Sequence, residues 1–89
     1  MRAIISVIGK DTVGILASVS AKCAEFNINV IEVTQSVLQD MFVMVMMTDI
    51  SAINADFSEF VDAMTEMGNE KHLSIRAMHE DIFNAMHNI

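Results

Sequence analysis

An 89-residue chain has material for one hydrophobic core, because a chain this short buries only about 60–65% of its unfolded surface. Its hydrophobic content of 53% excludes intrinsic disorder, and its net charge of −7 opposes binding to nucleic acid or to anionic lipid surfaces. The single cysteine cannot form an intramolecular disulfide, which favours a cytoplasmic protein. The longest apolar run, Met41 to Met47, is far shorter than the roughly 20 residues that span a bilayer, so no membrane anchor is expected.

The chain begins with the patterns of a strand and then of a helix. Residues 2 to 8 are short and β-rich and end at Gly9, which predicts a mostly buried strand. We expect Asp11 or Thr12 to cap the helix that follows, because a short side-chain oxygen accepts a bond from a first-turn amide. The helix is predicted to end near Asn27, and its apolar residues recur at helical spacing: Ile15, Leu16, Val19, Cys23 and Phe26.

Two strand patterns follow with only a short link between them. Residues 28 to 38 and residues 41 to 48 are both rich in β-branched or apolar positions. The link Gln39-Asp40 lacks the Asn-Gly pair preferred in tight turns, although aspartate tolerates a left-handed backbone. The sequence therefore predicts a β-hairpin.

A second amphipathic helix is predicted from Asp56 to Gly68. Acidic residues are concentrated in its N-terminal half, where they favour the positive end of the helix dipole. Asp56 with Glu59 three residues later forms a variant of the capping box, and Gly68-Asn69 supplies a left-handed stop. The apolar face of this helix consists of Phe57, Phe60, Val61, Met64 and Met67.

The last part of the chain completes a ferredoxin-like plan. His72 to Met78 alternates between apolar and polar residues, which suits a half-buried edge strand, and a helix from Glu80 to Asn88 follows. The order βαββαβ predicts an α+β fold with a four-stranded antiparallel sheet, two helices on one face and a short C-terminal helix. We expect one domain over residues 1–79, with residues 80–89 as a helical tail of the same domain.

Both faces of the predicted strand from Met41 to Met47 are apolar, and two helices can cover only one of them. We expect a second subunit and the tail to cover the other face, which predicts a homodimer or a higher homo-oligomer. The apolar stripe of the tail consists of Ile82, Phe83, Met86 and Ile89. The nine methionines are interpreted as adaptable core filling, with no role as metal ligands.

The loop between the first strand and the first helix is the candidate binding site. Gly9 and Gly14 bracket it, and the helix that follows offers unpaired amides and a partial positive charge to a carboxylate or another small anion. Glycine in a first helical turn costs about 1 kcal/mol relative to alanine. Either close approach of a ligand to the backbone or a tight packing contact would explain Gly14.

These segments resemble the ACT domain. The residues that carry the resemblance are Ile8-Gly9-Lys10-Asp11-Thr12-Val13-Gly14-Ile15-Leu16 and, further on, Ala24-Glu25-Phe26-Asn27-Ile28-Asn29-Val30. The resemblance covers about residues 2 to 78. Among ACT proteins the chain is similar to the free-standing single-domain group and to the ACT halves of the glycine cleavage repressor.

The resemblance implies a regulatory module that binds an amino acid or another small ligand at a subunit interface. Carried over, its ligand-binding positions are Asp11, Thr12, Val13, Gly14 and Asn29. Amides near Val13 and Gly14 would take the carboxylate of the ligand, while Asp11 and Asn29, the latter from a neighbouring subunit, would take its ammonium. Asp11 departs from some amino-acid-sensing members, which carry an uncharged amide there, and its negative charge disfavours a purely anionic ligand. Local hydrogen bonding is an open alternative for Asp11, Asn27 and Asn29.

Two other functions are compatible with the same fold. An acylphosphatase-like enzyme has the same plan, but the loop here contains Lys10 and Asp11 and no arginine to cradle phosphate. A protein-interaction module with no small ligand would use the apolar sheet face. Cys23 lies on the apolar side of its helix, which indicates packing and not nucleophilic catalysis, and a single cysteine cannot form a metal-binding pair. We expect no catalytic residue, no cofactor and no metal.

Overall fold

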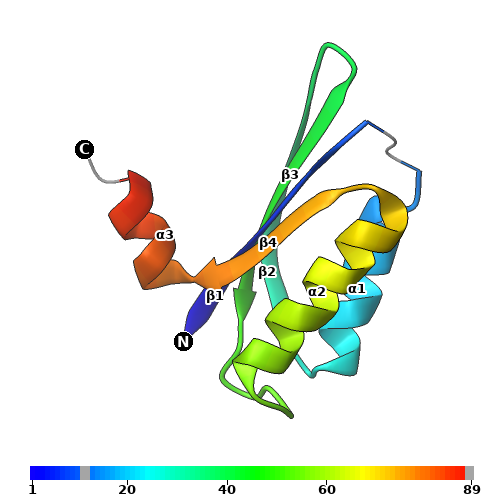
Figure 1. Cartoon of the computed structure of the whole chain (residues 1–89). Coiled ribbons are helices and arrows are strands. Elements are labelled where there is room, and N and C mark those ends of the chain that lie inside the picture. The colour runs from blue at the N-terminus through cyan, green and yellow to red at the C-terminus, as the bar shows by residue number, and fades with distance from the viewer. Residues whose placement is uncertain (11–12, 88–89) are drawn as a thin grey trace.

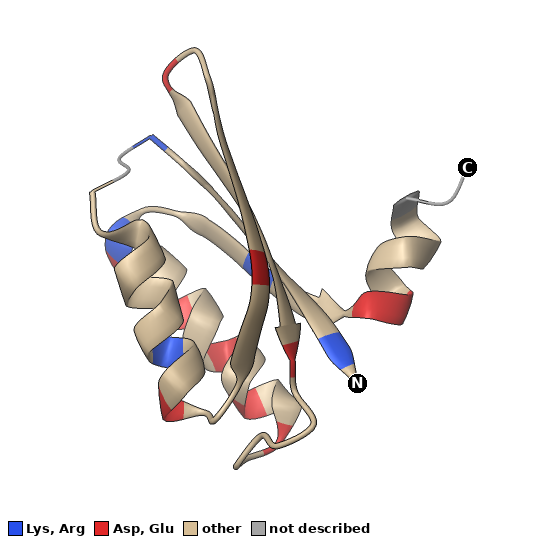
Figure 2. Cartoon of the chain, turned by 180° about the vertical axis from the view of Figure 1, so that it is seen from behind, with Lys and Arg blue, Asp and Glu red and all other residues tan. Residues whose placement is uncertain are grey.

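The computed structural model describes residues 1–10 and 13–87, which form a sheet with helices on both sides (Figure 1). The elements in chain order are β1 (Arg2–Gly9), α1 (Ile15–Glu25), β2 (Asn29–Leu38), β3 (Met41–Asp49), α2 (Phe57–Lys71), β4 (Ser74–His79) and α3 (Glu80–His87). The four strands are antiparallel to their neighbours and lie in the order β2-β3-β1-β4, with β4 at one edge as predicted. Figures 1 and 2 show α1 and α2 on one face and α3 on the opposite side. The predicted ferredoxin-like fold is confirmed.

The core lies between the sheet and the layer formed by α1 and α2. Alternate residues of each central strand point into it, and they are at most 5% exposed: Ala3, Ile5, Val7, Phe42, Met44 and Met46. Phe60 of α2 is fully buried among them and meets Phe26 in an edge-to-face contact, with ring centroids 5.2 Å apart. Met44, Met46 and Met64 are fully buried, which confirms that methionines fill this core.

The first helix starts later than a cap at Asp11 or Thr12 requires. Its N-cap is Gly14, at φ 74°, so the capping prediction is wrong, while Asp11 and Thr12 themselves lie outside the described residues. The predicted end is confirmed, because Asn27 adopts a left-handed conformation at φ 58° just beyond the helix. The hairpin is also confirmed, and its left-handed residue is Gln39 at φ 59°.

The second helix is longer than predicted. It continues through Gly68 to Lys71, and the left-handed residue that ends it is His72, at φ 58°. Its N-cap is Asp56, as predicted, but no side-chain bond caps the first turn, so the capping-box prediction is wrong. Gly68 serves packing instead, because a Cβ atom there would lie 2.7 Å from the carbonyl oxygen of Leu73.

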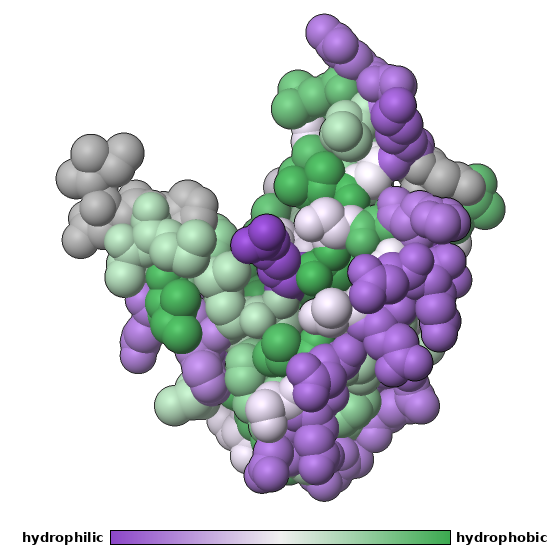
Figure 3. Space-filling model, in the orientation of Figure 1, coloured by the Kyte–Doolittle hydropathy of each residue, from purple (hydrophilic) through white to green (hydrophobic). Residues whose placement is uncertain are grey.

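The face of the sheet opposite α1 and α2 is called the outer face here. The prediction that the tail covers it is correct only at one end, where α3 contacts β1 and β4. On this face Ile4 is 4% exposed, whereas Ile8, further along β1, is 41% exposed. Ile82 and Met86 of the tail remain 52% and 62% exposed, and Ile89 lies outside the described residues. Figure 3 shows hydrophobic side chains in the hollow between α3 and the hairpin.

Candidate ligand-binding site

The two glycines of the β1–α1 loop are required for different reasons. A Cβ atom at Gly9 would overlap the side chain of Leu73, so this glycine permits close packing of β1 against the start of β4. Gly14 is not explained by packing, because no described residue beyond its chain neighbours lies within 4 Å of a Cβ placed there. Its φ of 74° accounts for the residue, since only glycine adopts this conformation without strain. Among the described residues, only the chain neighbours of Gly14 border the space where its side chain would lie.

The N-terminus of α1 presents the positive end of the helix dipole, and its described first turn holds no acidic residue. Gly14 has no side chain to cap the first turn, and the first turn contains no acidic residue. The Gly14 carbonyl accepts the first helical hydrogen bond, from the Ser18 amide at 3.0 Å. Val13, which precedes the N-cap, is 88% exposed. This arrangement suits a carboxylate.

A shallow depression lies beside this helix end, lined by Val13, Ile15, Lys71 and Leu73. Lys71 brings an ammonium group to the same region as the α1 amides. Figure 2 shows basic segments on both sides of the grey loop. Lys71 was not among the site residues expected from the sequence. The predicted topology nevertheless indicates its position, because antiparallel pairing of β1 with β4 brings the end of β1 next to the turn that precedes β4.

Asn29 does not lie near this loop within one chain. It pairs with Asp49 of β3, which in turn pairs with Arg2 at the start of β1. Gly9 is seven residues further along the same strand, so Asn29 and the loop are separated by about 23 Å of sheet. Val13 and Gly14 therefore lie together, Asn29 lies at the opposite end, and Asp11 and Thr12 are outside the described residues.

Asn27 has the local role that was left open as an alternative. Its side-chain amide donates to the carbonyl of Ala52 at 2.9 Å. Asn54 donates two bonds in the opposite direction: its side chain donates to the carbonyl of Glu25 at 2.9 Å, and its backbone amide donates to the carbonyl of Phe26 at 3.1 Å. These bonds tie the end of α1 to the β3–α2 connection.

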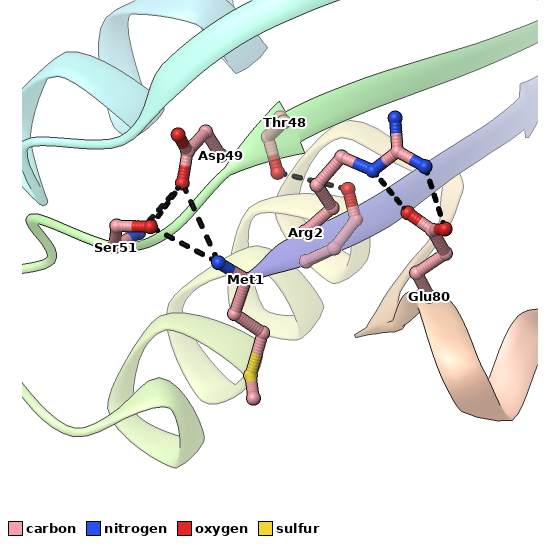
Figure 4. A network of polar contacts seen from close by, with 7 residues as sticks. Met1, Arg2, Thr48, Asp49, Ser51 and Glu80 are labelled. Atoms are coloured by element: carbon pink, nitrogen blue, oxygen red, sulfur yellow. Dashed lines mark hydrogen bonds and ion pairs between the residues drawn. The ribbon is translucent and has the colours of Figure 1, made fainter.

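A polar network that the sequence did not predict lies at the Asn29 end of the sheet (Figure 4). The N-terminal ammonium donates to Ser51 at 3.0 Å, and Ser51 donates to Asp49 through both its hydroxyl and its amide. These bonds from Ser51 lower the pKa of Asp49. Arg2 donates to the Glu80 carboxylate at 2.7 Å and forms a second contact through its Nε. The network joins the start of β1 to the end of β3 and to the first turn of α3.

The contact between Arg2 and Glu80 makes the attachment of α3 dependent on pH. Hydrogen bonding and charge from Arg2 lower the pKa of Glu80 from its ordinary value of 4.5. A carboxyl group whose pKa is lower in the folded state stabilises the fold above its unfolded pKa, and this stabilisation is lost as pH falls through the folded pKa. In a carbon NMR titration, Arg2→Gln should raise the pKa of Glu80 towards 4.5. Lys22→Gln, which removes the partner of Glu25, should leave it unchanged, and an unaltered Glu80 titration in Arg2→Gln would contradict the contact.

The remaining reactive side chains are explained by packing. Cys23 is fully buried, and burial raises the pKa of its thiol to about 11, so it stays protonated at neutral pH. His79 belongs to β4, not to the tail helix, and its ring lies 4.4 Å from that of Phe57 between centroids. Within residues 1–10 and 13–87 no group of three His, Cys, Asp or Glu residues is placed to hold a metal ion. No helix in the same ranges is long and apolar enough to cross a membrane.

The strand order and the two helices on one face of the sheet define the class of this protein: a ferredoxin-like α+β domain. The family model described as the ACT domain matches residues 2–77. The chain belongs to the ACT domain family. ACT domains are typically regulatory modules that bind small ligands.

Known proteins agree with this assignment. A UPF0237 protein of Listeria innocua is 48% identical over 89 residues, which is the full length of both chains. The structure of an ACT domain protein from Streptococcus pneumoniae superposes with a TM-score of 0.81 at 35% identity over 93% of each chain. A structure described as a glycine cleavage system transcriptional repressor has a TM-score of 0.70 at 19% identity. The match covers 85% of this chain and 43% of that one, so the fold corresponds to about half of it.

Proposed function

We propose that this chain is a non-catalytic regulatory module of the cytoplasm that binds an amino acid and acts as a homodimer. The observation that carries the proposal is the N-terminus of α1, which has no side-chain cap and no acidic residue in its first turn and opens onto free space at Gly14. Regulatory ligand binding is typical of the ACT family to which the chain belongs.

The chemistry of the loop suits the carboxylate end of an amino acid. Backbone amides at Val13 and Gly14 would donate to the carboxylate, and Lys71 in the same depression would add an opposite charge. The ammonium end needs an acceptor, and we assign it to Asp11 and Asn29. Because about 23 Å of sheet separates Asn29 from the loop within one chain, Asn29 would come from the second copy. The homodimer would thereby complete the site.

A thermal-shift panel of the twenty amino acids tests the proposal. A ligand that binds only the folded state at 100 times its Kd adds about 2.7 kcal/mol of stability, which raises the Tm of so small a domain by several degrees. We expect at least one amino acid to give such a rise. Gly14→Leu should abolish it, because the new side chain occupies the open space over the amides.

The control must separate loss of binding from loss of folding, since any residue other than glycine at Gly14 is strained at φ 74°. Gly14→Asn is the second variant, because asparagine tolerates the left-handed conformation while still filling the space. Ala21→Leu, at an exposed position of α1, is the matched control and should keep the ligand response. No response to any amino acid, or a response that survives in both Gly14 variants, would contradict the proposed site.

The second candidate function is a protein-interaction module. The apolar outer face favours it, because Ile8 and Met41 are 41% and 37% exposed on neighbouring central strands of the sheet. A flat thermal response to all twenty amino acids would favour this function over ligand binding.

A further inference from the structure

We propose that the outer face binds an amphiphilic monocarboxylate, a small molecule with one carboxylate and a hydrocarbon tail. Arg76 of β4 and Ser6 of β1 would hold the carboxylate, and the apolar side chains around them would cover the tail. The outer face lies on the opposite side of the sheet from α1 and α2 (Figures 1 and 2). This site is therefore separate from the candidate site at Gly14, which belongs to α1.

The outer face presents a continuous apolar surface on three neighbouring strands. The strand register places six apolar side chains of β1, β3 and β4 next to one another: Ile4, Ile8, Val43, Val45, Met47 and Met78. Ile4 is buried and Ile8 is 41% exposed, while the other four are partly exposed. The two methionines have flexible side chains, which adapt to ligands of different shape. An exposed apolar surface of this kind marks a binding site.

Ser6 and Arg76 place two polar groups within this apolar surface. They lie directly opposite each other in the pairing of β1 with β4. Side chains in such a pair have Cβ atoms about 4.5–5.5 Å apart, so both can bond to one carboxylate. Along β1 the neighbours of Ser6 on the same face are Ile4 and Ile8. An apolar lining with a few convergent polar groups is typical of small-molecule sites.

The guanidinium of Arg76 has the charge that this ligand requires. Arg76 is exposed and makes no ion pair with the described residues. Arg2, in contrast, is already bonded to Glu80 through two of its nitrogens. A planar guanidinium forms two parallel bonds with a carboxylate, and Arg76 has this geometry to offer. Figure 3 shows hydrophilic surface directly beside hydrophobic side chains in the hollow between α3 and the hairpin.

The charges around Arg76 favour a ligand with a single carboxylate. Glu32 on β2 is three strand spacings from β4, about 14 Å, and Glu80 is four residues beyond Arg76, about 13 Å along the chain. Both distances exceed the Debye length of about 8 Å at physiological ionic strength, so repulsion of one carboxylate is largely screened. The net charge of −7 still opposes an occupant with many acidic groups, such as an acidic helix or an anionic membrane.

Titration calorimetry of the full chain with sodium decanoate, at concentrations below micelle formation, tests the site. We expect one decanoate per chain. Octanoate, which is two methylenes shorter, should bind up to about 15-fold more weakly, because less hydrocarbon is buried. Decyltrimethylammonium has the same tail with the opposite charge and should not bind. In an NMR titration with decanoate the amide signals of Ser6 and Arg76 should shift, and that of Ser18 on α1 should not.

Variants of Arg76 separate the carboxylate contact from unspecific binding of the tail. Arg76→Gln should weaken decanoate binding at least about tenfold, because it removes the charge-assisted bonds. Arg76→Lys keeps the charge but loses the paired geometry, so its affinity should lie between the two. Lys22→Gln removes one positive charge from the helix side of the sheet, and this matched control should bind decanoate like the wild type. Arg76→Gln should also keep the thermal response to amino acids, because that response depends on Gly14.

Absence of decanoate binding, equal binding of decyltrimethylammonium, or an unchanged affinity in Arg76→Gln would overturn the proposal. Light scattering distinguishes the other occupant of this face, a second copy of the chain. If the wild type binds no decanoate and has the mass of two copies, and Val43→Glu reduces this mass to that of one copy, the outer face is an interface between copies and the ligand site is wrong.

Discussion

Replacement of Phe60 by alanine should lower the free energy of unfolding by about 3–5 kcal/mol, the largest effect expected of any single core truncation here. Phe60 is fully buried, and its ring lies 5.2 Å from that of Phe26 and 6.1 Å from that of Phe57 between centroids. The variant loses the transfer free energy of the ring and two aromatic contacts, and it leaves a cavity between α2 and the sheet. A domain of 89 residues has roughly 4–13 kcal/mol of total stability, so the variant should lose between about a quarter and all of it.

Urea unfolding at one fixed protein concentration measures this loss, because the stability of a dimer depends on concentration. Val37→Ala is the matched control: Val37 pairs with Phe42, is 63% exposed near the end of the hairpin, and its truncation should change stability by less than about 0.5 kcal/mol. An equal effect of the two substitutions would show that Phe60 is not at the centre of the core.

Replacement of Gly68 by valine should cost about 3 kcal/mol. A Cβ atom at this position would lie 2.7 Å from the carbonyl oxygen of Leu73 and 3.3 Å from Cγ1 of Ile75, so α2 must move away from the start of β4. Overpacking of this kind typically costs 1–3 kcal/mol, and the first clash is with backbone, which cannot rotate out of the way. Valine gains little over glycine in helix propensity, so little offsets the strain.

The neighbouring exposed position provides the control for Gly68. Asn69→Val, in the same turn of α2, should change the unfolding free energy by less than about 0.5 kcal/mol. Thermal unfolding followed by circular dichroism compares the two variants. A Gly68→Val protein as stable as the wild type would mean that the close approach of α2 to β4 is not required.

The sequence was sufficient where a local pattern has one physical interpretation. The side-chain period of two in β3 determined which residues share a face. Because both faces are apolar, only the structure decided that Phe42, Met44 and Met46 face the helices. The short Gln39-Asp40 link likewise determined the hairpin. Local patterns were insufficient at helix ends. In the sequence, Gly68 looks like the stop of a helix, yet α2 continues to Lys71. The glycine lies inside the helix because α2 packs closely against the start of β4 at this position.

The candidate site, too, could be predicted from the sequence only in part. The sequence alone determined a glycine-bounded loop at the positive end of the first helix, because a glycine between a strand and an amphipathic helix marks both the turn and the unpaired amides. Only the tertiary structure decided that Lys71 joins this loop, that Asn29 lies at the opposite end of the sheet, and that α3 leaves most of the outer face open. Each of these facts depends on strand order and register, which join residues far apart in the chain and leave no periodic signal in the sequence.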